Sequence, residues 1–258
     1  MNFNLDFLPP RSEKPRNAGF TMMTDMGLSV REAENFAESS APYTDFVKMA
    51  FGSSLLIPSL ESKLNIYQDA GITPIFGGTL FEIFAYRKNM EEYVNYLDKY
   101  GMDFVEISDG AIQIEHEEKV SYIKQFQEEY NVISQATNFS TGGIIPFDKW
   151  IENTKKEIGA GAKYIIVKES EKLPIYGDEG LASFIAAKSP KGLNIKQLIW
   201  DASSKEEQIE LIKLFGNDVN ICNVEPSGVI SLETRRMGLH SSTLLQLIKA
   251  PLKNDENQ

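Results

Sequence analysis

Cysteine and histidine are almost absent from this chain. Its 258 residues include one cysteine, Cys222, and two histidines, His116 and His240. A single cysteine cannot form an internal disulfide, which favours a reducing, cytoplasmic compartment. No histidine lies beside Cys222 in the sequence, so we expect it to be buried as a small hydrophobic residue. With no His/Cys cluster and no G-x-S-x-G motif, zinc hydrolysis and serine-triad chemistry are not expected.

Long apolar runs and an excess of positive charge are also missing. No run of about 18 apolar residues occurs, so no membrane-spanning helix is expected. The opening residues lack the pattern of a signal peptide. Lys and Arg number 26 against 37 Asp and Glu, a net charge of -11. A negative field opposes nucleic acid and anionic membranes, so we expect a small molecule as the partner, with neither nucleic acid nor membrane.

Eight short apolar runs alternate with longer amphipathic stretches, as in successive βαβ units. Runs that are apolar nearly throughout are typical of strands covered on both faces. Strands are therefore predicted at Gly19–Asp25, Tyr43–Ala50, Ile72–Gly78, Phe104–Gly110, Asn131–Thr137, Lys163–Lys168, Leu198–Ser203 and Val219–Val224. Eight such units predict an α/β fold, a TIM (β/α)8 barrel. The alternative, an open doubly wound sheet, usually has a Gly-rich phosphate loop after its first strand, and none follows here.

The segments between these runs carry helical spacing and helix-end signals. Ser29 and Glu32 have the spacing of a capping box. Gly71, Gly101 and Gly161 each follow a predicted helix, where glycine accepts the left-handed cap conformation. No linker divides the chain, so one domain over residues 1–258 is predicted, with flexible ends at about 1–12 and 252–258.

Barrel active sites lie at the carboxyl ends of the strands. The charged residues predicted there are Asp25, Lys48, Glu82, Glu106, Asp109, Lys168 and Asp201. Converging carboxylates can hold Mg²⁺, and a lysine among them can donate a proton, act as a base or form a Schiff base. Structural roles remain open for each: Glu106 as a satisfied interior carboxylate, Lys48 as a partner of Asp25, Lys168 as a solvent-exposed side chain, and Glu82 as the first turn of a helix.

Seven stretches in order along the chain carry a family resemblance. They are Lys14-Pro15-Arg16 with Gly19, Phe46–Leu56, Gly77–Glu82, Val105–Gly110, Ala160–Ile166, Val219–Val224 and Ser231–Leu239. The chain resembles the phosphosulfolactate synthase family. The resemblance implies a Mg²⁺-dependent TIM barrel that adds sulfite to phosphoenolpyruvate in coenzyme M or sulfolactate biosynthesis. A small anionic substrate would then bind with its phosphate near the loops after the seventh and eighth strands.

The strand-end chemistry and the resemblance together give a candidate site. The expected catalytic residues are Lys168, Lys48 and Glu106. The expected metal ligands are Glu106, Asp201 and Glu82. The expected substrate-binding residues are Asp25, Gly77, Gly78, Thr79, Asn223, Arg236 and His240.

The second half of the chain departs from the family pattern. Gln135–Asn138 lacks the glutamate and the lysine of the family's fifth strand, that lysine being its expected proton donor. Lys168–Leu173 replaces an acidic and glycine-containing sixth-strand motif, and His240 stands where the family has arginine. Lys168 could take over the proton transfer. Two alternatives remain: a Schiff-base, aldolase-type lyase using Lys168, and a catalytically inactive barrel with a binding or stress-related role. The leucine-rich C-terminal helix could support a homo-oligomer or pack on its own barrel.

Overall fold

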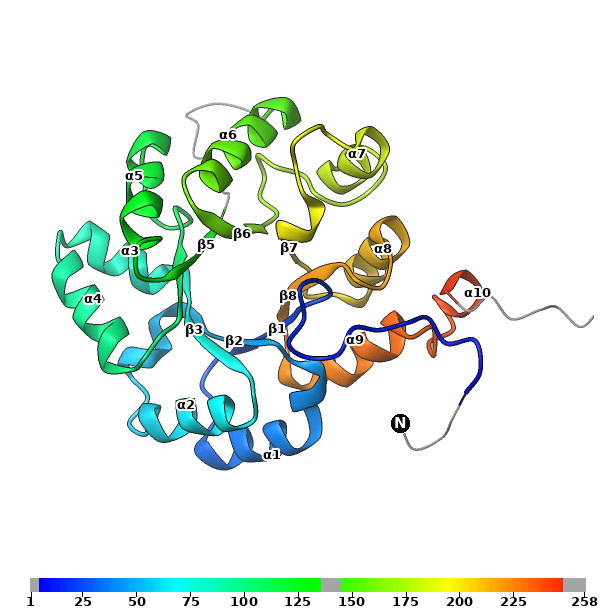
Figure 1. Ribbon diagram of the computed structural model, residues 1–258, viewed down its shortest axis with the longest axis horizontal. Coiled ribbons are helices and arrows are strands. Elements are labelled where there is room, and N and C mark those ends of the chain that lie inside the picture. The colour runs from blue at the N-terminus through cyan, green and yellow to red at the C-terminus, as the bar shows by residue number, and fades with distance from the viewer. Residues whose placement is uncertain (1–4, 136–144, 248–258) are drawn as a thin grey trace, which may run out of the picture.

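Eight parallel strands close into a barrel in the computed structural model, which describes residues 5–135 and 145–247 (Figure 1). Each strand pairs with the next in the chain, and β8 returns to β1. The strands are β1 Thr21–Asp25, β2 Phe46–Met49, β3 Thr73–Phe76, β4 Phe104–Ile107, β5 Asn131–Gln135, β6 Ala162–Val167, β7 Leu198–Asp201 and β8 Asn220–Val224. The predicted TIM barrel is confirmed, and every predicted run overlaps one observed strand.

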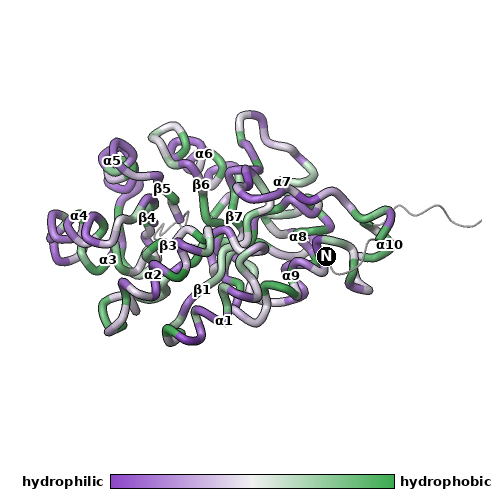
Figure 2. Tube along the Cα trace, turned by 60° about the horizontal axis from the view of Figure 1, so that its bottom comes forward, coloured by the Kyte–Doolittle hydropathy of each residue, from purple (hydrophilic) through white to green (hydrophobic). Residues whose placement is uncertain are grey.

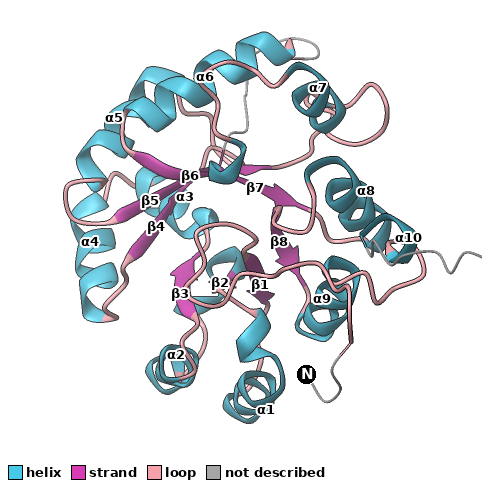
Figure 3. Ribbon diagram, turned by 45° about the vertical axis from the view of Figure 1, so that its right-hand side comes forward, coloured by secondary structure: helices cyan, strands magenta, loops and turns pink. Residues whose placement is uncertain are grey.

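Helices surround the strands as an outer ring (Figure 3). They alternate between hydrophilic and hydrophobic colour along their length, as amphipathic helices do when one face packs on a barrel (Figure 2). The helices are α1 Val30–Ser40, α2 Leu60–Asp69, α3 Gly78–Tyr86, α4 Met90–Lys99, α5 His116–Phe126, α6 Phe147–Gly159, α7 Leu181–Lys188, α8 Lys205–Phe215, α9 Val229–Arg236 and α10 Leu244–Leu247. Short 3-10 turns are η1 Ala41–Tyr43, η2 Ala50–Leu55, η3 Ile195–Gln197 and η4 Pro226–Gly228.

Helix ends follow the predicted local signals. The Ser29 hydroxyl accepts from the Glu32 amide at 3.3 Å, and the Glu32 carboxylate accepts from the Ser29 amide at 2.7 Å, so the capping box is confirmed. Gly71, Gly101 and Gly161 have φ of 67°, 59° and 115°. These positive values confirm the glycine caps, which turn the chain from a helix into the next strand.

The lower part of the barrel interior is filled by apolar side chains. Phe20, Phe46 and Phe104 meet edge to face, with centroids 5.5 and 5.2 Å apart. The rest of this layer is Met22, Ile75, Ile133, Ile166, Ile199 and Cys222, with Tyr164 against it. Because side chains alternate between the two faces of a strand, the next inward positions form a polar layer of Thr24, Lys48, Glu106, Gln135, Lys168 and Asp201. The apolar layer fills the barrel interior on the amino-terminal side of this polar layer, so a ligand can enter only from the carboxyl ends of the strands.

The segment before β1 closes the amino end of the barrel. Arg11 binds the carboxylate of Glu233 at 3.0 Å. The Lys14 ammonium donates to two backbone carbonyls in and after η1, at 3.0 and 2.5 Å. Arg16 binds Asp45, just before β2, at 2.9 Å. These three basic side chains attach the segment to α9 and to the amino ends of the strands.

The structure describes most of the predicted flexible N-terminal segment and none of the C-terminal one. Pro10 accepts a hydrogen bond from Asn217 at 2.9 Å, so the last residues of the predicted N-terminal segment are fixed to the barrel. The predicted C-terminal segment, 252–258, lies outside the described residues. Leu244 and Leu245 of α10 are 43% and 93% exposed, and the homo-oligomer stays a prediction. In the described part of the chain, no helix has the length and apolar character to cross a membrane.

Candidate active site

A cavity of about 360 Å³ opens at the carboxyl ends of the strands. Nine residues predicted from the sequence line it: Lys48, Gly77, Gly78, Thr79, Glu82, Glu106, Lys168, Asp201 and Asn223. We call this cavity the mouth. The sequence-derived residues are therefore brought together in one place, although they come from six different strand ends.

Lys48 and Glu106 form a buried ion pair on the floor of the mouth. The Lys48 Nζ lies 3.4 Å from Glu106 Oε2, and the two side chains are 14% and 2% exposed. Burial lowers the pKa of Lys48, but the charge of Glu106, with contributions from Cys222 and Asp201, raises it, so that the pKa ends above that of an ordinary lysine. Lys48 is thus a fixed positive charge at neutral pH, and its partner is Glu106 instead of Asp25.

Glu82 holds the loop that follows β4. Its carboxylate accepts from the Ser108 hydroxyl and from the amides of Gly110, Ala111 and Ile112, the three amides at 3.0, 2.5 and 2.8 Å. Glu82 is 3% exposed and lies in the second turn of α3. Four donors surround its two oxygens, an arrangement that favours loop positioning over binding of a metal.

Asp201 and Asn223 meet on the opposite side of the mouth. Asn223 Nδ2 donates to Asp201 Oδ1 at 2.8 Å. Asn223 has φ of 61°, and the β1–β8 register shifts beside it, since Thr21 and Met23 oppose Ile221 and Val224. Such an irregularity re-aims a side chain, and here it brings Asn223 to the mouth where strict alternation would send it outward.

Lys168 directly follows β6, and its exposed side chain lines the mouth. Among the described residues, no hydrogen bond or ion pair reaches its ammonium. Gln135, at the end of β5, lines the mouth as well. Asn138, one of the positions that depart from the family pattern, lies outside the described residues.

Cys222 lies beneath the charged layer and is fully buried. Burial raises the pKa of its thiol, and the charge of Asp201 raises it further, while Lys48 lowers it. The thiol is therefore protonated at neutral pH, which agrees with the expected role of a small hydrophobic residue.

Asp25 faces away from the mouth. It is fully buried and accepts from the Tyr67 hydroxyl at 2.7 Å, with the Lys63 ammonium also at 2.7 Å. Burial and the charge of Asp25 raise the pKa of Tyr67. The reason is strand alternation: Thr24 points inward, so Asp25 points outward, and its position is that of a structural carboxylate instead of a substrate ligand.

Arg236 and His240 also lie away from the mouth. The fully buried Arg236 donates to backbone carbonyls of Asn217, Val219 and Phe20, at the amino ends of β8 and β1. His240 binds the Ser242 hydroxyl at 2.7 Å. Helix α9 runs back along the barrel after β8. Arg236, its last residue, and His240, four residues further on, therefore lie away from the carboxyl ends of the strands. The structure therefore does not place either residue where a substrate at the mouth could contact it.

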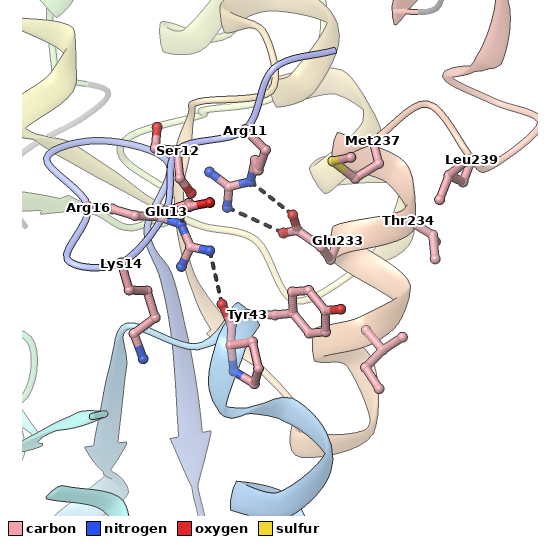
Figure 4. Close-up of a pocket in the computed structure, with 12 residues that line it drawn as sticks. Arg11, Ser12, Glu13, Lys14, Arg16, Tyr43, Glu233, Thr234, Met237 and Leu239 are labelled. Carbon is pink, nitrogen blue, oxygen red and sulfur yellow. Dashed lines mark hydrogen bonds and ion pairs between the residues drawn. The ribbon is translucent and has the colours of Figure 1, made fainter. Parts of the chain in front are cut away.

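A second cavity, of about 430 Å³, lies between the N-terminal segment, η1 and α9 (Figure 4). Arg11 is held by Glu233 there, and Arg16 donates to the Pro42 carbonyl at 2.9 Å. The remaining wall is mainly apolar, from residues such as Ile230, Met237 and Leu239. Its two guanidinium groups are already paired with carboxylates, and the ammonium of Lys14, which also lines it, donates to two backbone carbonyls.

Several mouth residues were not predicted. Thr24 and Ser108 line it, and each stands two residues beyond an inward-facing residue, Met22 and Glu106. That spacing was the available signal. Phe51 also lines it, 69% exposed and with φ of 52°, and it belongs to the Phe46–Leu56 stretch that carries the family resemblance.

The carboxylates at the mouth differ in how well they suit Mg²⁺. In the described ranges, no three His, Cys, Asp or Glu side chains gather into a metal cluster. Mg²⁺ is, however, usually held by one or two carboxylates with substrate oxygens and waters. Glu106 Oε2 is buried and makes no hydrogen bond, although the Lys48 ammonium lies 3.4 Å from it as an ion-pair partner. Asp201 lines the same cavity. These two carboxylates fit such a site, whereas Glu82 is already surrounded by donors.

Comparisons with known proteins agree on one family. The model of "(2R)-phospho-3-sulfolactate synthase (ComA)" matches residues 9–242. The chain is 32% identical over 248 residues to phosphosulfolactate synthase of Bacillus subtilis (strain 168), covering 94% of this chain and 98% of that one. It is 34% identical over 235 residues to phosphosulfolactate synthase of Methanocaldococcus jannaschii, covering 87% and 93%. Orotidine 5'-phosphate decarboxylase from Lactobacillus acidophilus shares the fold, with a TM-score of 0.54 at 8% identity, over 85% and 99% of the chains.

Proposed function

The chain belongs to the (2R)-phospho-3-sulfolactate synthase family, and on this premise we propose that it adds sulfite, or a similar small nucleophile, to phosphoenolpyruvate at the mouth. The observation that carries the proposal is the charge arrangement there. A fixed Lys48–Glu106 pair lines one cavity with Asp201 and with the Lys168 ammonium, which has no ion-pair partner among the described residues. A cavity with these groups suits a small substrate whose own charge is negative and which gains a proton during reaction.

The reaction joins two anions without an oxidant or reductant. The sulfur lone pair of sulfite attacks C3 of phosphoenolpyruvate and forms the C–S bond. The C2–C3 π electrons move to C2 and are delocalised into the carboxylate as an enolate. A proton then reaches C2, and the phosphate ester stays intact. The protein must therefore offset negative charge on the carboxylate and deliver one proton.

Lys168 is the residue that we assign to proton delivery. Its ammonium lies at the mouth with no hydrogen-bond or ion-pair partner among the described residues, so it can approach C2 of a bound substrate. Lys48 is less suited to this step because its pKa is raised by Glu106. We assign Lys48 to electrostatic stabilisation of the enolate, and Glu106 to holding Lys48 in place.

Mg²⁺ is the cofactor we propose, with Glu106 and Asp201 as the residues that would hold it. When bound, the cation supplies positive charge to the carboxylate oxygens on which the enolate charge develops. The mouth is lined by three carboxylates and two lysines, so by formal charge it is negative before any anion binds. This negative formal charge supports binding of a cation together with the anionic substrate.

The inactive-barrel alternative is less well supported by this mouth. A decayed site would be expected to fill with apolar side chains, whereas this cavity is lined by Lys48, Glu106, Lys168 and Asp201. Burying the Lys48–Glu106 pair costs desolvation free energy, and its retention favours a site that still receives a ligand.

The direct experiment is incubation of the purified chain with phosphoenolpyruvate, sulfite and Mg²⁺, with phosphorus NMR and mass spectrometry of the product. In deuterated water, one deuterium should appear at C2. The Lys168→Met variant should lose nearly all turnover yet still bind phosphoenolpyruvate. Lys172→Met, four residues along the same loop, is the matched control and should keep wild-type turnover. Absence of product across the neutral pH range would exclude the proposed reaction.

The Schiff-base alternative has its own readout. Borohydride reduction in the presence of a panel of 2-oxo acids would leave a covalent adduct on Lys168 if that lysine forms an imine. Under our proposal no adduct forms, because Lys168 acts only as an acid. A mass increase on Lys168 that is absent from Lys168→Met would replace the sulfite reaction with an aldolase-type one.

A further inference from the structure

The hydroxyl of Thr24 is buried at the mouth without a partner. Thr24 is 7% exposed and lines the cavity, and its Oγ1 makes no hydrogen bond to any described residue. A hydroxyl can donate one hydrogen bond and accept two. A buried hydroxyl that makes none of these hydrogen bonds costs free energy. A group that enters the mouth and accepts a hydrogen bond from Thr24 would therefore bind more favourably.

Two sources of positive potential lie beside this hydroxyl. Lys48 is the strand partner of Thr24 in the β1–β2 register. A Cβ built on Gly77 would lie 3.5 Å from the Lys48 side-chain carbons, so the start of α3 adjoins the same lysine. The first amides of a helix have no carbonyl partner within it, and the helix dipole is positive there. Three neighbouring strands thus place these groups in a row: β1 carries Thr24, β2 carries Lys48, and β3 leads into the first turn of α3.

Glycine at the start of α3 lets the Ser108 and Glu106 side chains approach the helix closely. A Cβ on Gly78 would overlap the Ser108 hydroxyl and lie 2.9 Å from Glu106 Oε1. The Gly77 cap residue makes no side-chain hydrogen bond to the helix, since it has no side chain. Gly78 and Thr79 line the mouth, and their amides, in the first turn of α3, have no carbonyl partner within the helix, as at other helix N-termini that bind anions.

We propose that the Thr24 hydroxyl, the Gly78 and Thr79 amides and the Lys48 ammonium form a subsite for a small oxyanion. The inference rests on the proposed function, because it names the part of the mouth that receives one of the two substrates. The oxyanion is either sulfite or an anionic group of phosphoenolpyruvate. Both present oxygens that accept from a hydroxyl, an amide and an ammonium, and the experiment below separates them.

The test compares Thr24→Val with Thr21→Val, and both variants keep the shape of threonine. Thr21 is on the same strand, is 1% exposed, and its Oγ1 is equally without a partner, but it does not line the mouth. For Thr24→Val we expect a rise in one KM of about tenfold or more, the effect of one hydrogen bond to a charged group. Thr21→Val should keep both KM values, and Thr24→Ser should restore the lost affinity.

Each result has one meaning. A rise in the KM for sulfite assigns the subsite to sulfite, and a rise in the KM for phosphoenolpyruvate assigns it to that substrate. If Thr24→Val lowers the melting temperature and leaves both KM values unchanged, the hydroxyl has a structural role and the subsite is refuted.

Failure of the proposed reaction would show separately. If the wild type makes no product, the melting temperature with added sulfite, sulfate or phosphate still reports anion binding. Protection that is lost in Thr24→Val and kept in Thr21→Val supports the subsite without the reaction. Equal protection of both variants, or none in the wild type, overturns it.

Discussion

Replacing Lys48 by methionine would leave the Glu106 carboxylate without its cation, where the carboxylate side chain is only 2% exposed and the lysine 14%. Removing one partner of a buried ion pair destabilises a protein by about 3–5 kcal/mol, because the remaining charge stays buried without compensation. In a chain of this size, 1 kcal/mol shifts the melting temperature by about 2–4 °C. We therefore expect Lys48→Met to unfold roughly 10 °C below the wild type.

The double variant Lys48→Met/Glu106→Gln separates charge from packing. It removes both charges and should recover most of the lost free energy of unfolding, measured by urea denaturation. Because the pKa of Lys48 is raised in the folded state, its stabilisation is fully present at neutral pH and is lost only as the pH rises through that higher pKa. The difference between wild type and Lys48→Met should thus be flat across the neutral range. Equal stability of Lys48→Met and wild type, or a double variant as unstable as the single one, would refute the ion-pair reasoning.

Three further results are expected. Glu82→Ala should release the amides of residues 110–112 to fast hydrogen exchange while amides elsewhere in the barrel stay protected; unchanged exchange would contradict the loop-positioning role. Cys222 should resist thiol reagents in the native protein at mildly alkaline pH and react once unfolded, since burial raises its pKa; rapid native labelling would show an open route to it. Lys119→Met should lower the free energy of unfolding by about 3–5 kcal/mol, because Lys119 is fully buried beside two carboxylates. Lys149→Met, which breaks an exposed pair, should lower it by less than about 1 kcal/mol. Equal losses in urea denaturation would argue against the burial effect.

The strands were predictable because parallel barrel strands are covered on both faces and read as apolar runs. Their facing was harder to predict. In β1, Met22 and Met23 are both fully buried, so apolar character does not mark the inward face. Asp25, the charged residue at the end of this strand, was predicted at the mouth. Alternation from the inward-facing Met22 instead places Thr24 there and Asp25 on the outer face.

Two other placements depended on features that a linear pattern does not carry. Asn223 was predicted at the mouth, but its route there is a register shift with φ of 61°, which alternation alone does not give. Arg236 was expected to bind substrate because of the resemblance carried by Ser231–Leu239, yet one helix separates it from the end of β8. Two turns of α9 carry it to the amino end, where three carbonyls take its donors. A residue at the far end of the helix that follows a strand lies at the opposite end of the barrel from that strand's carboxyl end.

The net charge of -11 does not describe what a ligand meets at the mouth. Glu82 is surrounded by hydrogen-bond donors from its own protein, and Glu106 is offset by Lys48. That leaves Asp201, which accepts from Asn223, and Lys168, which directly follows β6, the strand that pairs with β7. The local field is therefore close to balanced, and one added cation would make it favourable for an anion. A site of this kind should bind its anionic substrate more tightly when Mg²⁺ is present, and charge reversal at Lys168 should weaken binding of the anion while leaving the Lys48–Glu106 pair intact.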